Sequence, residues 1–157
     1  MELHFELIAP GKVSPDILKV CHTIRDKVFI EEQAVPREVE RDNNDPHCGH
    51  LLLLRGEKGV GTLRIRLTEK GIKLERIAVI PQERGKQLGK LLTQEGVKRA
   101  RELYPNRPIY ILAQVQASPF YASLGFTATG GYIEEGNRLH VTMTLSSEAE
   151  ARILNLK

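Results

Sequence analysis

The sequence has 157 residues, of which 41% are hydrophobic and 27% are charged, with a formal net charge of +3. A chain of this length can bury one hydrophobic core, and so small a net charge does not indicate nucleic-acid binding. It contains no long apolar run that would span a membrane and no signal-peptide pattern in "MELHFELIAP". Its two lone cysteines, Cys21 and Cys48, are typical of reduced thiols. We therefore predict a cytoplasmic protein that binds neither nucleic acid nor membrane.

The first half of the chain predicts a strand, a helix and three further strands. "HFELIA" has strand character, and Ser14 and Pro15 are suited to open a helix that continues with apolar residues at helical spacing through Gln33. The polar, acidic segment 34–49 contains proline and predicts a long loop or a broken helix. Residues 50–81 contain three strand-like runs separated by "GEKG" and "EKG", which predicts an antiparallel meander.

The second half predicts two helices and three strands. A helix from about Leu88 to Tyr104 ends before Pro105, and "IYILAQVQ" follows as a strand. The short helix "SPFYASLG" has Gly125 as a candidate C-cap, and residues 126–145 predict a closing hairpin. Residues 147–157 are either a terminal helix or a frayed tail. The alternation of strands and helices predicts an α/β or α+β fold, with helices packed on a central mixed sheet.

The junction between a strand and a helix at "PQERGKQLGK", residues 81–90, is unusually rich in glycine and positive charge. Arg84, Lys86 and Lys90 surround the start of the helix. Glycines and the free N–H groups of a helix N-terminus together form a site for anions such as phosphate. A turn whose glycines serve geometry alone explains the composition equally well. The segment lacks the spacing of a P-loop and of a dinucleotide-binding fingerprint.

Three motifs in this order resemble those of the GNAT N-acetyltransferases. "IAVIPQERGKQLGKLL" resembles the family's acetyl-CoA loop, R/Q-x-x-G-x-G/A, with Gln87 in place of the central glycine. "QVQASPFYASLGF" resembles the second signature, N-x-x-A-x-x-F-Y-x-x-x-G-F, with Gln114 in place of asparagine. "IRDKVFIEEQAVPREVERDNNDPHCGHLLL" and "GNRLHVTM" resemble the YjcF-like (ElaA-like) branch of small GNAT proteins.

The resemblance implies a fold and a domain organisation. We expect a central mixed, mostly antiparallel sheet of about six or seven strands, with helices on both faces. The fourth strand (Leu74–Val79) should splay from the fifth (Ile109–Val115). A single domain would cover residues 1–146, followed by a tail or short helix over 147–157.

The resemblance also implies that acetyl-CoA is the acetyl donor and that no metal is needed. The pantetheine arm would lie between the splayed strands, and the amide of Val79 would stabilise the oxyanion. The residues expected to bind the donor are Ile77, Ala78, Val79, Arg84, Gly85, Lys86, Gln87, Leu88, Gly89, Lys90, Gln114 and Phe120.

Acetyl transfer to an amine needs a base for the ammonium and an acid for the departing thiolate. Tyr121 matches the family's acid, although it could be only a packed aromatic residue. Strand alternation would place Glu75 beside Ile77 and Val79, where apolar neighbours would raise its pKa and suit it as the base. An exposed Glu75 paired with Arg64, Arg66 or Arg76 is the alternative. His140 is a second base, a substrate contact or a packed strand histidine.

The first helices of GNAT folds line the acceptor side, which makes Arg25, Phe29 and Glu32 candidates for substrate binding. Arg25 would bind a substrate carboxylate or pair with Glu32. The acidic segment that follows would attract a cationic amine or form a solvated loop. Its acidic residues are Glu38, Glu40, Asp42 and Asp45.

The resulting hypothesis is an acetyl-CoA-dependent N-acetyltransferase. It would transfer the acetyl group by direct attack in a ternary complex to a primary amine of a small molecule, a peptide or a protein. A non-catalytic acyl-CoA-binding regulatory module is the alternative, and acyl-homoserine-lactone synthesis, which uses the same fold, ranks last. The chain would act as a monomer or a homodimer.

Overall fold

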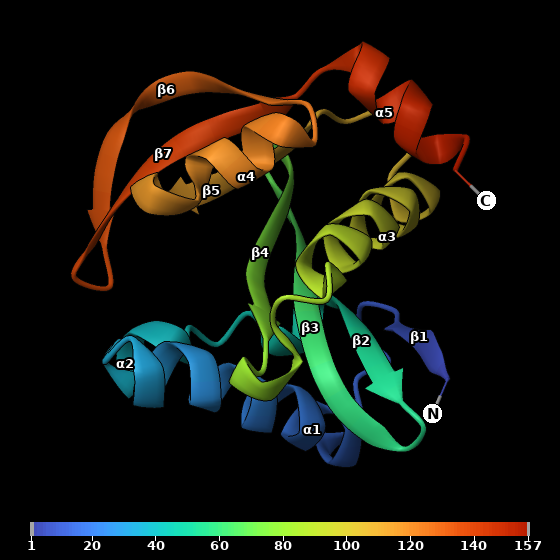
Figure 1. Cartoon of the computed structure of the whole chain (residues 1–157), viewed down its shortest axis with the longest axis vertical. Helices are drawn as coiled ribbons and strands as arrows, with labels where there is room; N and C mark the ends of the chain where they lie inside the picture. The colour runs from blue at the N-terminus through green and yellow to red at the C-terminus, as the bar shows by residue number, and fades with distance from the viewer. Residues whose placement is uncertain (1, 157) are drawn as a thin grey trace.

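The computed structural model describes residues 2–156 as one seven-stranded sheet with helices on both faces (Figure 1). The predicted order of strands and helices is confirmed. The strands are β1 (Leu3–Ile8), β2 (Gly49–Arg55), β3 (Lys58–Thr68), β4 (Gly71–Val79), β5 (Ile109–Gln114), β6 (Phe126–Glu135) and β7 (Arg138–Leu145). The α-helices are α1 (Pro15–Arg25), α2 (Arg37–Glu40), α3 (Leu88–Leu103), α4 (Ser118–Ser123) and α5 (Ser147–Leu154).

Short non-α turns connect several of these elements. The predicted long first helix continues past α1 as the π-helical segment η1 (Asp26–Glu32). The predicted loop or broken helix of 34–49 contains α2 and the 3₁₀ turn η2 (Asp45–His47). Two further 3₁₀ turns, η3 (Pro81–Glu83) and η4 (Val115–Ala117), follow β4 and β5.

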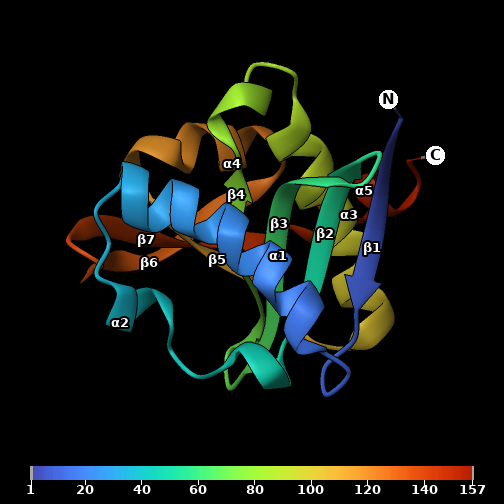
Figure 2. The same cartoon turned by 90° about the horizontal axis from the view of Figure 1, so that it is seen from below.

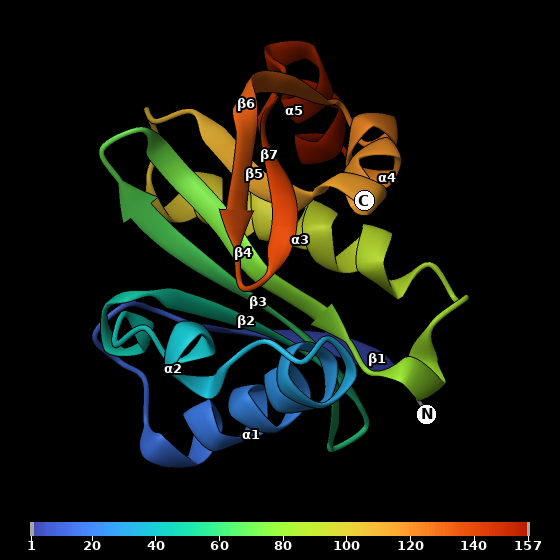
Figure 3. The ribbon, with the colours of Figure 1, turned by 90° about the vertical axis from the view of Figure 1, so that its left-hand side faces the viewer.

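The sheet order is β1-β2-β3-β4-β5-β7-β6, and every neighbouring pair is antiparallel except β4 and β5. This parallel pair is short, since only Ile72–Leu74 of β4 pairs with Ile109–Ile111 of β5. Both strands run on beyond this contact without pairing to each other. The predicted splay between the fourth and fifth strands is therefore confirmed, and Figure 3 shows β5, β7 and β6 turning away from β3 and β4.

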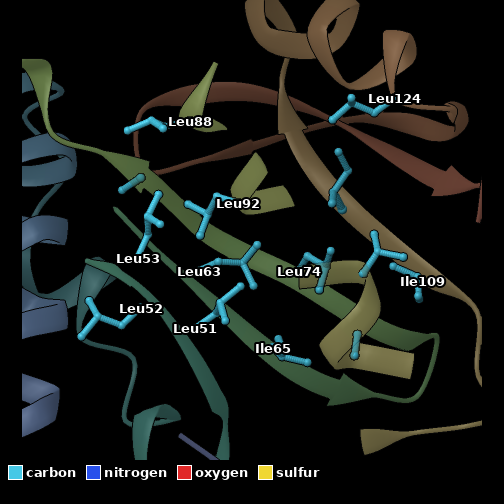
Figure 4. Packing of buried hydrophobic residues seen from close by; sticks show 14 of the residues in the cluster. Leu51, Leu52, Leu53, Leu63, Ile65, Leu74, Leu88, Leu92, Ile109 and Leu124 are labelled. Carbon is cyan, nitrogen blue, oxygen red and sulfur yellow. The ribbon is translucent and has the colours of Figure 1, made fainter. Parts of the chain in front are cut away.

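The two faces of the sheet are covered by different helices. Helix α1 lies across one face, with η1 and α2 after it, and α3, α4 and α5 lie on the other (Figures 2 and 3). Strand β2 is therefore buried almost throughout, as expected for a strand covered on both faces. Leucine and isoleucine side chains form the core between the sheet and α3, among them Leu63, Leu74 and Leu92 (Figure 4).

Two glycines allow helices to approach their neighbours closely. A Cβ atom at Gly96 of α3 would lie 2.7 Å from a methyl carbon of Leu63. A Cβ atom at Gly125, after α4, would lie 2.0 Å from the Cβ of Ala149 in α5. Ala149 and Ile153 are buried, and Arg101 of α3 donates two hydrogen bonds of 2.7 and 2.8 Å to Glu150. The C-terminal segment is thus a packed helix and not the frayed tail that its sequence also allowed.

Both cysteines lie in the interior and neither forms a disulfide. Cys21 of α1 and Cys48 before β2 are 0% and 1% exposed. Burial raises the pKa of both thiols, that of Cys48 to about 11.

Replacing Gly125 by alanine should destabilise the protein strongly. The new Cβ would overlap Ala149, at a backbone φ of +102° that side chains rarely adopt. We expect the free energy of unfolding, measured by urea denaturation, to fall by about 2–4 kcal/mol. Gly131→Ala is the matched control, because no heavy atom lies within 4 Å of its Cβ position. Equal losses in the two variants would contradict the packing of α5 described here.

Candidate active site

A cavity of about 230 Å³ lies where β4 and β5 diverge. Its walls come from η1 and α2 on one side and from β4, β5, α4 and the β6–β7 hairpin on the other. Six residues predicted to act in catalysis or binding line it. They are Phe29, Glu75, Ile77, Gln114, Tyr121 and His140. Segments far apart in the sequence therefore line one cavity.

A β-bulge in β4 shapes this cavity. Arg76 has a left-handed backbone with φ +52°, and the register with β3 shifts between Arg64 opposite Glu75 and Thr62 opposite Ala78. The bulge adds one residue to β4, so Glu75 and Ala78 lie on one face of the sheet and Val79 on the other. The predicted alternation that placed Glu75 beside Val79 is therefore wrong.

The end of β4 presents a backbone amide to the gap. Ile80 N donates to Val60 O at 3.0 Å, so the amide of Ile80 points toward β3. Successive amides of a strand point to opposite edges, and the N–H of Val79 therefore points to the β5 side, where β5 has already diverged. This orientation fits the oxyanion role predicted for Val79.

Tyr121 lies on α4 at the edge of the cavity. Its ring packs edge-on against Phe120 and Phe126, with centroid distances of 5.0 and 6.0 Å. Burial raises the pKa of its hydroxyl to about 12, so the group keeps its proton at neutral pH. The hydroxyl is suited to donate a proton or a hydrogen bond and unsuited to act as a base.

His140 is half-buried in β7, opposite Gln114 of β5. Its Nδ1 lies 2.9 Å from the carbonyl oxygen of Arg138. Because a carbonyl oxygen only accepts, Nδ1 carries a proton, and the neutral ring has its free lone pair on Nε2. The half-buried, hydrogen-bonded ring agrees with the packed strand histidine among the alternatives, and its tautomer leaves Nε2 able to accept a proton.

The pKa of Glu75 is shifted in the opposite direction from the one predicted. It is buried, and its carboxylate contacts Arg64, Arg66 and Lys73, the last at 3.0 Å. Burial alone would raise its pKa, but these three cations outweigh burial and lower the pKa to about 2. A carboxylate this acidic is a poor proton acceptor. The pairing with Arg64 and Arg66 agrees with the alternative prediction, although the exposure that it assumed is wrong.

Glu75 belongs to a larger set of charges, buried or half-buried except for Arg37, here called the ion network. It joins the loop between α1 and β2 to the strands β3 and β4. Arg25 donates to Glu40 and Asp45, and Arg64 donates to Asp42, Asp45 and Glu75. The cations are Arg25, Arg37, Arg41, Arg64, Arg66, Lys73 and Arg76, and the anions are Asp26, Glu40, Asp42, Asp45 and Glu75.

The ion network corrects two predictions about the acceptor side. Arg25 is 1% exposed and pairs with Glu40 and Asp45, not with Glu32, so its guanidinium has no access to a substrate. The acidic segment is not a solvated loop, because Glu40 and Asp45 are buried beneath arginines. Glu38 alone among its acidic residues is exposed. Within residues 2–156, no three histidine, cysteine or carboxylate side chains are grouped as a metal site would require.

The predicted anion loop follows β4 and η3. Gly85 has φ +79° and Gln87 φ +62°, so Gln87 adopts the left-handed backbone that glycine would adopt more easily. Helix α3 then starts without a side-chain cap or an acidic residue in its first turn. In the described part of the chain, the amides of residues 87–90 donate no hydrogen bond to a protein group. Lys86 and Lys90 are exposed beside them, and Phe120 lies 3.7 Å from the Cβ position of Gly89.

Arg84 connects this loop with the acceptor side. Its guanidinium donates two hydrogen bonds of 2.6 Å to Glu32 of η1, and its Nε donates to Val79 O at 3.1 Å. Both side chains are exposed. Gln33, the next residue, accepts a hydrogen bond of 2.8 Å from Gln114 at the end of β5. Glu32 therefore faces the loop and not the cavity.

The profile of the acetyltransferase (GNAT) domain matches residues 12–147. This match covers most of the chain. The chain belongs to the GNAT acetyltransferase family. The resemblance of the three motifs to those of the GNAT family is thereby confirmed. Membership of this family also shows that the chain is of the acyltransferase class.

Individual GNAT relatives agree with this assignment. The chain is 36% identical over 110 residues to the "Uncharacterized N-acetyltransferase YjcF" of Bacillus subtilis, covering 69% of this chain and 77% of that protein. The crystal structure of Escherichia coli ElaA has a TM-score of 0.83 at 23% identity, covering 92% of this chain and all of that one. The Tetrahymena GCN5 histone acetyltransferase domain in complex with coenzyme A shares the fold, with a TM-score of 0.65, 16% identity, and 90% and 92% coverage.

Glu75→Gln should destabilise this GNAT domain in a pH-dependent way. The pKa of Glu75 is lowered from 4.5 to about 2, so its ionised form stabilises the fold fully above pH 4.5 and loses this effect as the pH falls toward 2. We expect the variant to lose about 3–5 kcal/mol of unfolding free energy at pH 7, measured by urea denaturation, and to approach the wild type near pH 2.

The exposed Glu57→Gln is the control for the loss of one carboxylate. It should leave the unfolding free energy unchanged at both pH values. A gap between Glu75→Gln and wild type that stays constant from pH 7 to pH 2 would show that Glu75 is not held ionised by its neighbours.

Proposed function

We propose that the protein is an acetyl-CoA-dependent N-acetyltransferase that acts on a primary amine by direct attack in a ternary complex. The observation that carries this proposal is the cavity between β4 and β5, where Tyr121, His140 and Ile77 meet. An acid, a base oriented by its tautomer and an open strand edge are the parts that direct acyl transfer from a thioester needs. Glu75 is not part of the proposed machinery.

The groups next to this cavity are suited to bind the donor, acetyl-CoA. The free edge of β4 beyond Leu74 can pair with the amides of a pantetheine arm. The free amides of residues 87–90 and the exposed Lys86 and Lys90 suit a pyrophosphate. Coenzyme A in the Tetrahymena GCN5 structure supports the donor class. Bound there, acetyl-CoA would supply an activated acetyl group.

The reaction then requires the transfer of two protons. The acceptor arrives as an ammonium ion and leaves as an amide, and so it loses two protons in all. His140 Nε2 accepts the first and passes it to solvent, which frees the amine to attack the thioester carbon. As the carbon–sulfur bond breaks, the Tyr121 hydroxyl donates a proton to the sulfur, and the second amine proton restores the hydroxyl through solvent. The N–H of Val79 stabilises the carbonyl oxygen during attack.

Coenzyme A binding tests the donor site directly. We expect wild-type protein to bind coenzyme A in a calorimetric titration, and Lys90→Glu to weaken binding at least about tenfold, because a negative charge would face the pyrophosphate. Lys58→Glu, an exposed charge reversal in β3, should bind like wild type. Absence of binding by the wild type would refute the donor assignment.

Kinetics test the proton donors and acceptors. Tyr121→Phe and His140→Gln should each lower kcat about 10²-fold or more while the affinity for acetyl-CoA stays nearly constant. The assay is release of coenzyme A with a panel of amines. If wild type binds acetyl-CoA but transfers to no amine, the chain is a non-catalytic acyl-CoA-binding module. If both variants keep full activity, the cavity is not the reaction site.

A further inference from the structure

The cavity is lined by equal numbers of cations and carboxylates. The cations are Lys73, Arg76 and Arg138, and the carboxylates are Glu40, Glu75 and Glu135. In the ion network, seven arginine and lysine side chains contact five carboxylates. Glu40 and Glu75, the two acidic network members that line the cavity, each contact three cations. Neither is therefore available to attract a cationic amine. Among the charged residues that line the cavity, Arg138 and Glu135 lie outside the ion network.

Arg138 adds a cation outside the ion network. It lies at the start of β7, half-buried, and lines the cavity. Among the described residues, no carboxylate lies within 4 Å of its guanidinium, and its register partner Glu135 forms no ion pair with it. The guanidinium donates one long hydrogen bond of 3.5 Å to the carbonyl oxygen of Gln33. Most of its five donors are thus available to a ligand.

The position of Arg138 relative to His140 limits the shape of that ligand. The two residues are separated by one position in β7, so their side chains leave the same face of the strand about 7 Å apart along it. Both face the cavity. A molecule whose amine meets His140 Nε2 therefore has its next polar group, a few bonds away, near the guanidinium of Arg138.

We propose that the acceptor is a small amine that also carries a carboxylate, as an amino acid does, and that Arg138 binds this carboxylate. The inference rests on the proposed function and narrows it. A planar guanidinium with free N–H groups matches a carboxylate in a bidentate geometry.

The test compares each amino acid with its own carboxamide. Both members of a pair present the same amine and side chain, and only the acid carries the negative charge. The twenty L-amino acids and their carboxamides are assayed as acceptors with acetyl-CoA, following release of the free thiol. For the best pair, we expect kcat/KM for the acid to exceed that for the amide at least tenfold. Arg138→Gln should remove this preference mainly through KM, while Arg138→Lys should keep part of it.

Arg152→Gln is the matched control, since it deletes the same charge from the exposed surface of α5. It should keep the preference for the acid. Amides used as well as acids, or an Arg138→Gln variant with an unchanged ratio, would overturn the inference. Turnover of other amines but of no amino acid would overturn it as well while leaving the acetyltransferase intact. Failure of wild type to bind coenzyme A would instead remove the proposed function on which the inference rests.

Discussion

The pairing of Arg64 with Glu75, Asp42 and Asp45 holds the acceptor side of the molecule in place. Arg64 lies on β3 and is 1% exposed, while two of its partners come from the loop between α2 and β2. That loop is polar and contains little regular structure, so apolar packing alone would not fix its position. Buried ion pairs cost desolvation free energy and return it only when the geometry satisfies every charge. Each carboxylate of the network contacts at least two cations, which holds the loop in one position, and two buried atoms, Asp26 Oδ1 and Arg76 Nε, have no hydrogen-bond partner.

The same network keeps its own carboxylates ionised. Within it, Asp42, Asp45 and Glu75 all have lowered pKa values, because neighbouring cations, together with a hydrogen bond from His22 at Asp45, outweigh the effect of burial. These carboxylates remain ionised and inert over the range in which enzymes work. His140 lies outside the network and is hydrogen-bonded through Nδ1 to a backbone carbonyl. Glu75 lines the same cavity as His140, and the proposed proton acceptor thus lies outside the ion network.

The sequence was sufficient for the fold and insufficient for the orientation of Glu75. Turn residues and hydrophobic periodicity predicted the elements, and the cap at Ser14 is present, where its hydroxyl accepts from Ile17 N at 3.3 Å. The bulge at Arg76 carries no local signal, since a glycine or asparagine would be expected at positive φ and the strand pattern around it is regular. One extra residue reverses the face of every later side chain, and so the alternation argument failed there.

The ion network could not be predicted from the sequence, for a different reason. Its ion pairs join residues as many as 36 positions apart, as in Arg76 and Glu40, and nothing in the acidic segment shows that its charges are buried. Arg64 and Arg66 alternating with apolar residues in "LRIRL" were the available signal, because two arginines on one face of a central strand need anionic partners. The roles of the donor-binding residues and of Tyr121 stay predictions that the geometry permits.

The burial of Cys21 and Cys48 has a practical consequence for the chemistry of this chain. Thiol reagents and oxidants attack the thiolate, and a thiol whose pKa is about 11 is ionised to roughly one part in a thousand at pH 8. Exposures of 0% and 1% restrict access further. The two thiols of the folded protein should therefore not react with Ellman-type reagents. A single cysteine introduced on the surface would then be a unique attachment point for a spectroscopic label.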